Sequence, residues 1–166
     1  MRAIPVVVGL TAIVGLVDAA GAQGAARNKL FVEGDVVRGA QQGAPGPFCV
    51  LSNQFKRLEK VVWRIRVLDE AGQSLDNNGL KSVIVELPDG QKLNAKFDRH
   101  PPPAQGPALD HFWTAVWIIP TSYPSGSLGY KLVATGNDDQ SQTWEPFKSR
   151  PSQLTVVDGE IEIKKP

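Results

Sequence analysis

The chain has 166 residues, of which 42% are hydrophobic and 21% charged, with 18 Lys and Arg against 17 Asp and Glu. This composition can bury an ordinary core in one domain, and it excludes a disordered chain. A formal net charge of +1 favours no nucleic-acid partner, and one cysteine with two histidines excludes a disulfide framework and a zinc finger.

The first segment has the composition of a signal peptide, which we place at residues 1–22. Arg2 precedes the apolar run from 4 to 17, which is shorter than the roughly 20 residues that cross a bilayer. Residues 20–22 read Ala-Gly-Ala and fit the A-x-A cleavage pattern. We therefore expect a periplasmic or secreted protein with a linker at 23–29 and no membrane span in the mature chain. The alternatives are an uncleaved anchor and a buried helix.

The first half of the mature chain shows strand patterns separated by turns. Residues 30–37 and 48–51 are predicted as the first strand and its continuation after a Gly/Pro/Gln loop. Between 60 and 68 apolar and charged residues alternate, which is typical of a half-buried strand with Trp63 facing inward. The Pro-Asp-Gly turn at 88–90 predicts a hairpin with one arm before it and the other at 91–97.

The second half of the chain continues in the same way. Four prolines predict a loop over residues 99–108, and the apolar run at 111–119 predicts a strand covered on both sides or an aromatic edge. Further strands are predicted at 128–135, 142–147 and 154–157. About eight short strands without crossover helices predict an all-β, antiparallel β-sandwich over residues 30–158, followed by a C-terminal tail at 159–166.

Residues 112–135 resemble the end of an immunoglobulin-like or fibronectin-type-III-like domain. The resemblance rests on an aromatic strand, a Pro-Ser-Gly turn and the run Gly129-Tyr130-Lys131-Leu132-Val133-Ala134-Thr135. It implies that Tyr130 forms a corner, with its ring in the core and its hydroxyl bonded to backbone, and that Trp63 is a core anchor. The chain departs from antibody domains in having no second cysteine. The family implies a binding or spacer role and names no ligand.

No motif indicates catalysis. His100 and His111 are the imidazole bases, yet the chain has no G-x-S-x-G elbow, glycine-rich phosphate loop or H-E-x-x-H sequence. The carboxylates are scattered singly along the sequence. We therefore predict that the protein is not an enzyme and has no catalytic residue or resident cofactor.

A metal site is the sharper alternative. His100 and His111 lie on either side of the proline loop, and Cys49 follows another Pro/Gly loop. Two imidazoles and a thiolate suit copper or zinc, which gives the alternative of a periplasmic copper-binding protein using these residues as ligands. The structural alternative keeps both histidines in solvent or at a strand end. It leaves Cys49 as a small buried hydrophobe, and a bridge between chains is the third possibility for that residue.

Aromatic residues concentrate in the C-terminal half. Phe112 and Trp113 must point to opposite faces of one strand, so one of them leaves the core unless the strand is covered twice. An exposed ring there would suit a protein partner or a sugar, and Trp113 or Trp144 would carry a carbohydrate-binding module. Our main prediction is an exported, non-catalytic binding or accessory module that docks on another envelope protein.

Overall fold

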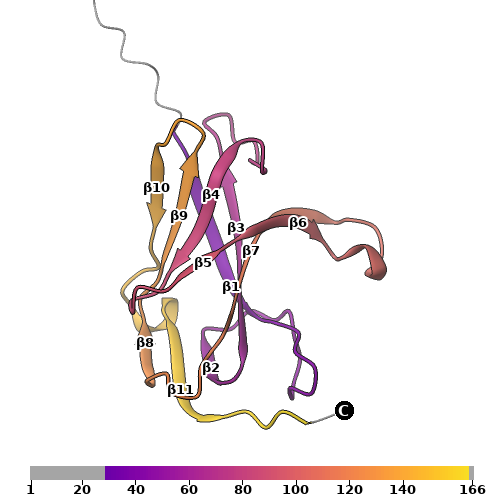
Figure 1. Ribbon diagram of the computed structural model, residues 1–166, viewed down its shortest axis with the longest axis vertical. Helices are drawn as coiled ribbons and strands as arrows, with labels where there is room; N and C mark the ends of the chain where they lie inside the picture. The colour runs from indigo at the N-terminus through magenta and orange to yellow at the C-terminus, as the bar shows by residue number, and fades with distance from the viewer. Residues whose placement is uncertain (1–28, 165–166) are drawn as a thin grey trace, which may run out of the picture.

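The computed structural model describes residues 29–164, and the predicted signal peptide lies outside this range. Within it the chain folds into eleven strands and two 3₁₀ helices, η1 (Pro103–Gln105) and η2 (Arg150–Ser152), with no α-helix. Figure 1 shows the strands as an elongated, sandwich-like body. The all-β class and the predominance of antiparallel pairing are as the alternation of side chains predicts.

The first sheet has the order β1-β3-β7-β6 and is antiparallel throughout. Its strands are β1 (Phe31–Arg38), β3 (Lys60–Leu68), β7 (Asp110–Ile118) and β6 (Lys96–His100). Strand β3 shows why the sheet forms, because its buried residues alternate with partly exposed ones along all nine positions. Every second side chain therefore enters the core, and the others form an outer face.

The second sheet has the order β10-β9-β4-β5. Its strands are β10 (Ser141–Trp144), β9 (Lys131–Gly136), β4 (Leu80–Glu86) and β5 (Lys92–Asn94). Its outer face carries the ion pairs Lys131–Glu145 and Lys92–Glu86, and the half-buried Ile84 and Val133 lie opposite each other on it. This face is ordinary solvated surface.

A third, short sheet of order β2-β11-β8 closes one end of the body. It contains β2 (Gln54–Arg57), β11 (Leu154–Glu160) and β8 (Gly126–Leu128), with β11 parallel to β2 and antiparallel to β8. Strand β2 is missing from the sequence prediction, although Phe55 within it is fully buried. Four residues are too few to show a period of two, which explains the omission.

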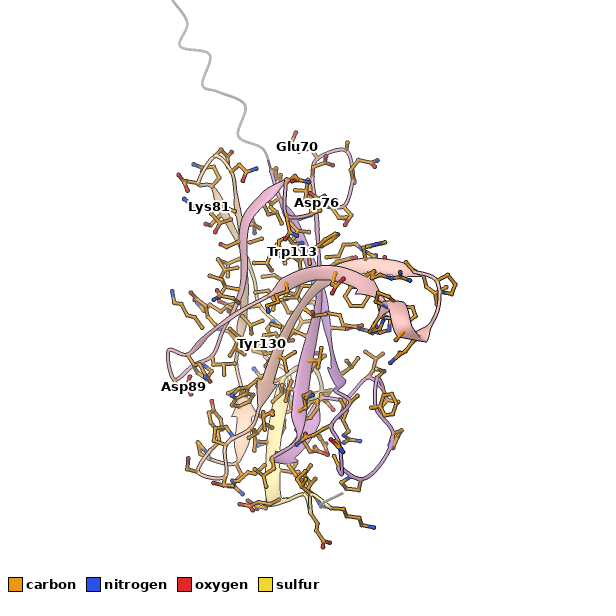
Figure 2. All side chains as sticks on the ribbon, turned by 45° about the vertical axis from the view of Figure 1, so that its right-hand side comes forward. Glu70, Asp76, Lys81, Asp89, Trp113 and Tyr130 are labelled. Atoms are coloured by element: carbon orange, nitrogen blue, oxygen red, sulfur yellow. The ribbon has the colours of Figure 1, made fainter. Side chains whose placement is uncertain are left out.

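The core lies between the two larger sheets. Trp63, Ile65 and Val67 of β3 are fully buried, as are Val85 of β4 and Leu132 of β9. Residues 128, 130, 132 and 134 are all buried, as their alternation predicts, although the chain divides there into β8 and β9 (Tyr130 is labelled in Figure 2). These side chains join one contiguous apolar cluster that includes both sheets.

Three local predictions differ from the structure. The hairpin strand predicted at 91–97 divides at Ala95. Leu93 pairs with Val85 in the second sheet, whereas Phe97 pairs with Trp113 in the first. Residues 49–52 fold back antiparallel to β1, as the Val37–Leu51 bridge shows, and do not continue it. In the tail, β11 extends to Glu160 and Ile161 is buried, so the domain continues past residue 158.

Candidate functional site

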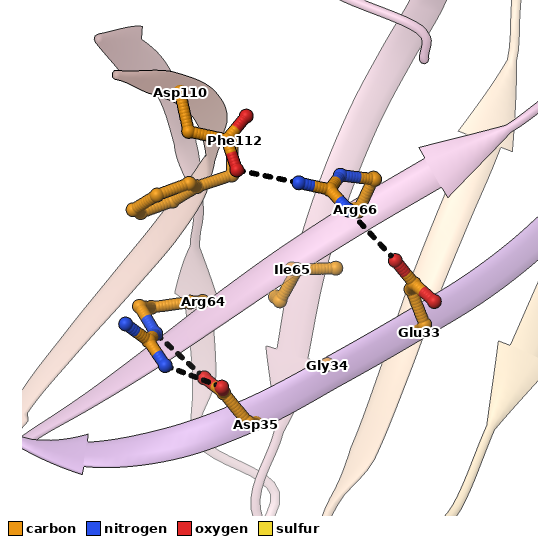
Figure 3. A pocket seen from close by; sticks show the side chains of 8 residues that line it. All are labelled: Glu33, Gly34, Asp35, Arg64, Ile65, Arg66, Asp110 and Phe112. Atoms are coloured by element: carbon orange, nitrogen blue, oxygen red, sulfur yellow. Dashed lines mark hydrogen bonds and ion pairs between the residues drawn. The ribbon is translucent and has the colours of Figure 1, made fainter. Parts of the chain in front are cut away.

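The outer face of the first sheet carries a row of paired charges. Asp35 and Glu33 on β1 lie opposite Arg64 and Arg66 on β3 in the strand register. Arg64 donates two hydrogen bonds to the Asp35 carboxylate, at 2.7 and 2.5 Å. Arg66 lies 3.3 Å from Glu33 Oε1 and donates to Asp110 Oδ2 of β7 at 2.5 Å. Figure 3 shows both arginines between the carboxylates.

These charges surround an open hollow of about 420 Å³ on the outer face. The hydrogen bonds to Asp35, and secondarily its charge, raise the pKa of Arg64 against the opposing effect of burial. Both arginines are paired with carboxylates, and Phe112 adds one aromatic wall. Solvent-exposed pairs of this kind contribute little stability, so the hollow is best regarded as a polar contact surface.

Apolar side chains occupy the same face one row further along the strands. Val62 of β3 lies opposite Val116 of β7, and Ile118 follows on β7 beside Lys60. Val116 is 50% exposed and Ile118 is 49% exposed. The prediction of a strand covered on both sides is therefore wrong for β7, because only its inner face lies in the core.

The hairpin formed by β6 and β7 projects from the body. Strand β7 pairs with β3 only as far as Trp113, whereas it pairs with β6 up to the His100–Asp110 position. Figure 1 shows this hairpin curving away from the sheets to the loop at its tip. We call this element the arm. Its tip is residues 101–109, and it does not fold back over the aromatic strand.

The tip combines exposure with an internal support. Its nine residues include no charged side chain, and Leu109 is 83% exposed. Arg99 donates from Nη2 to the Gly106 carbonyl at 2.6 Å and from Nε to the Pro101 carbonyl at 3.3 Å. The Leu109 N–H also donates to the His100 carbonyl at 2.9 Å. Arg99 thus joins the two sides of the tip and holds its shape.

The structure separates the three residues of the metal hypothesis. His100 and His111 occupy adjacent register positions on the arm, and strand alternation places their side chains on opposite faces. His100 packs on Phe112 at 5.3 Å between ring centroids, and His111 packs on Phe97 at 6.1 Å. Cys49 is exposed on its loop, so it is not the small buried hydrophobe of the structural alternative. Among residues 29–164, no three His, Cys, Asp or Glu side chains gather in an arrangement that could hold a metal ion.

The two core anchors named from the sequence lie in the core. Trp63 is fully buried, Tyr130 is 4% exposed, and their rings meet edge to face. Burial raises the pKa of Tyr130 to about 12, and the Trp63 indole N–H acts in the opposite direction. In the part of the chain that the structure describes, the Tyr130 hydroxyl has no hydrogen bond to backbone, so the tyrosine corner expected from the resemblance does not form.

The two tryptophans of the carbohydrate hypothesis are poorly placed for sugar stacking. Trp113 is 4% exposed and donates from Nε1 to the Leu75 carbonyl at 2.9 Å. Trp144 is half-buried and packs on the Tyr130 ring at 6.2 Å. Both indoles therefore have protein partners.

The sequence prediction missed Arg99 and the two arginines of β3 as surface-organising residues. Alternation alone indicated that Arg64 and Arg66 face outward, but their carboxylate partners lie 29 to 44 positions away in the chain. Arg99 was predicted as the first residue of the proline loop, whereas the structure places it in β6. Pairing across strands is visible only once the register is known.

Comparison with protein-family models gives no match to this chain, and a search of curated proteins gives none either. Within residues 29–164, none of the helical segments has the length and apolar character that a bilayer crossing needs. The function must therefore be argued from the fold and the surface.

Proposed function

We propose that this protein is an exported, non-catalytic binding module with an immunoglobulin-like fold, and that it docks on another envelope protein through the tip of the arm. The export part rests on the signal-peptide composition of residues 1–22. The docking part rests on one observation, which is that a projecting, uncharged tip exposes Leu109 to solvent.

The order of the strands supports the immunoglobulin-like assignment. Such domains place strands A, B, E and D in one sheet and strands C, F and G in the other. When β1, β3, β4, β6, β7, β9 and β10 are read as strands A to G, the first sheet has the order A-B-E-D and the second contains G-F-C. Strand β5 is then an additional strand beside C. The assignment explains why β6 and β7 are neighbours although the arm leaves the body.

The composition of the tip supports a protein partner. A contiguous apolar element that is exposed on a projection is a typical docking element, because its transfer from water to a partner pocket is favourable. At the base of the tip the charges of Lys96 and Arg99 balance those of Asp98 and Asp110, so the base has no excess positive charge to hold an anionic membrane surface. The complementary surface on the partner is therefore expected to be concave, apolar and uncharged.

The Arg99 contacts support binding of this kind by preorganisation. A flexible loop loses conformational entropy when it docks, and a loop that is already ordered loses less. The two carbonyl contacts of Arg99 join both sides of the tip before any partner arrives. His100 and Phe112 pack together on one face of the arm and stiffen its base.

In the test, the tagged full chain is used as bait to capture its partner from an extract of the cell envelope in which it is made. The captured protein is then purified, and its affinity for the wild-type chain is measured by calorimetry. Leu109→Ser should weaken that affinity at least about tenfold, because an anchor side chain at the centre of an interface is lost. Phe147→Ser is the matched control, since Phe147 is also an exposed apolar residue at 81%, in the loop after β10. The proposal would be contradicted if the wild-type chain and both variants bound with equal affinity, or if Leu109→Ser and Phe147→Ser lost affinity to the same extent.

A further inference from the structure

The outer face of the first sheet shows a regular arrangement of side chains in three neighbouring rows. In the first row Glu33 lies beside Arg66, and in the second Asp35 lies beside Arg64. The third row is apolar and takes one residue from each of four neighbouring segments. In order across the face, these residues are Leu51, Val37, Val62 and Val116. Its two ends are the exposed ones, with Leu51 at 70% and Val116 at 50%.

This arrangement is complementary to itself. Consider a two-fold axis that runs parallel to the strands, above the boundary between β1 and β3. This axis places β1 of one copy over β3 of the other, and each row of one copy lies over the same row of the other. Glu33 then faces the second copy's Arg66, and Asp35 faces its Arg64. In the apolar row, Leu51 faces the second copy's Val116. Val37 lies on the line toward its Val62 but is only 3% exposed, because its own chain already covers it. Acid thus meets base in the two charged rows, and exposed apolar residues meet at the two ends of the third row.

We infer that a second copy of this chain packs face to face on this surface and forms a two-fold symmetric dimer. Symmetric dimers are the commonest assemblies of soluble proteins, and their interfaces must be complementary to themselves. Packed sheets commonly lie about 10 Å apart, which is the spacing at which valine and leucine side chains from two faces interdigitate. The arginines then contact carboxylates of both copies.

The charges favour a second copy over a different protein. The two charged rows contain two carboxylates and two arginines, and Asp110 beside Arg66 adds a third carboxylate, so this part of the face has little net charge with which to select an acidic or basic partner. Selectivity for the partner comes instead from the arrangement of the charges, with acids on β1 and bases on β3. A matching surface must have bases opposite β1 and acids opposite β3, as a second copy does. This inference does not depend on the proposed docking of the tip, which uses a different part of the molecule.

The first experiment measures the oligomeric state of the purified full chain by sedimentation equilibrium over a range of micromolar concentrations. The wild-type chain should show a dimer that dissociates on dilution. Val116→Lys should give a monomer, because at each end of the apolar row it places a charge against the second copy's Leu51. Thr143→Lys is the control and should remain dimeric, since Thr143 is exposed on the outer face of the second sheet.

The second experiment exchanges the charges. A Glu33→Arg/Asp35→Arg chain presents only basic residues in the two charged rows, and an Arg64→Glu/Arg66→Glu chain presents only acidic ones. Each should be monomeric alone, and an equimolar mixture should restore a dimer that contains one chain of each kind. Circular dichroism and thermal melts of each variant separate loss of association from loss of folding.

Three results would overturn the dimer. They are a monomeric wild-type chain at all concentrations, equal dissociation of the Val116→Lys and Thr143→Lys chains, and two charge variants that fold but do not associate when mixed. Leu109→Ser should dimerise like the wild-type chain. Failure of the tip to bind a partner and failure of the face to dimerise are therefore separate outcomes.

Discussion

Trp63 of β3 and Tyr130, just before β9, meet across the two sheets with their ring centroids 5.5 Å apart and their planes at 69°. This edge-to-face geometry joins the first sheet to the second at the centre of the core. Trp117 extends the contact on one side, with its centroid 6.4 Å from that of Trp63. The position of the outer face depends on this contact, because β3 carries Trp63 inward and the two paired arginines outward.

Replacement of Trp63 should have the largest effect on stability. Trp63→Ala removes a fully buried indole and leaves a cavity that the surrounding strands cannot fill, so we expect a loss of about 3–5 kcal/mol. Trp144→Ala is the comparison and should cost less, because Trp144 is only half-buried. Urea unfolding followed by circular dichroism measures both values. A loss of similar size in the two variants would contradict the central place of Trp63.

Ionisation of Tyr130 should destabilise the protein at high pH. Its pKa rises from 10.0 to about 12 on folding, so above pH 10 the unfolded state loses its proton before the folded state does. The free energy of unfolding should therefore decrease between about pH 10 and 12, by about 2–3 kcal/mol from this group. Tyr130→Phe should show a smaller decrease over the same range. Parallel curves for the two proteins would rule out this contribution.

Gly34 should tolerate no larger residue on the inner face of β1. A Cβ added there would lie 2.7 Å from Leu132 Cδ1 and 3.1 Å from the Arg64 carbonyl oxygen. We expect Gly34→Ala to destabilise by about 1–2 kcal/mol through overpacking, although alanine is otherwise favoured over glycine in a strand. At Gly129 an added Cβ meets nothing within 4 Å, so Gly129→Ala should be neutral or slightly stabilising. Thermal unfolding of the two variants distinguishes them.

Arg99 should control the order of the tip with little effect on global stability. Arg99→Met keeps the aliphatic stem but removes both carbonyl contacts, so the amides of the non-proline tip residues, 104–106 and 108–109, should exchange with solvent at least about tenfold faster. The melting temperature should change little, because the tip lies outside the core cluster. Lys96→Met on the same strand is the control and should leave exchange at the tip unchanged. Unchanged exchange in Arg99→Met would show that the loop is ordered by other contacts.

Local patterns in the sequence are sufficient to predict the class of fold and most of the core. Alternation at 60–68 identified the inner face of β3, and the run from 128 to 134 identified the buried side of β8 and β9, because a strand presents every second residue to the same face. The prolines between His100 and His111 also predicted the loop that became the tip. These features are local, and local periodicity is what a single sequence displays.

The positions of the surfaces, in contrast, depend on how distant strands pair in the folded chain. The chain crosses between sheets at Ala95, and the segment at 49–52 folds back along β1. In β7, the residues that precede Trp113 no longer pair with β3 and belong to the arm. Each feature follows from pairing between strands that are distant in sequence, and register is set by how two faces pack rather than by either strand alone. For the same reason, the opposite faces of His100 and His111 and the paired rows of Glu33, Asp35, Arg64 and Arg66 appear only in the folded protein.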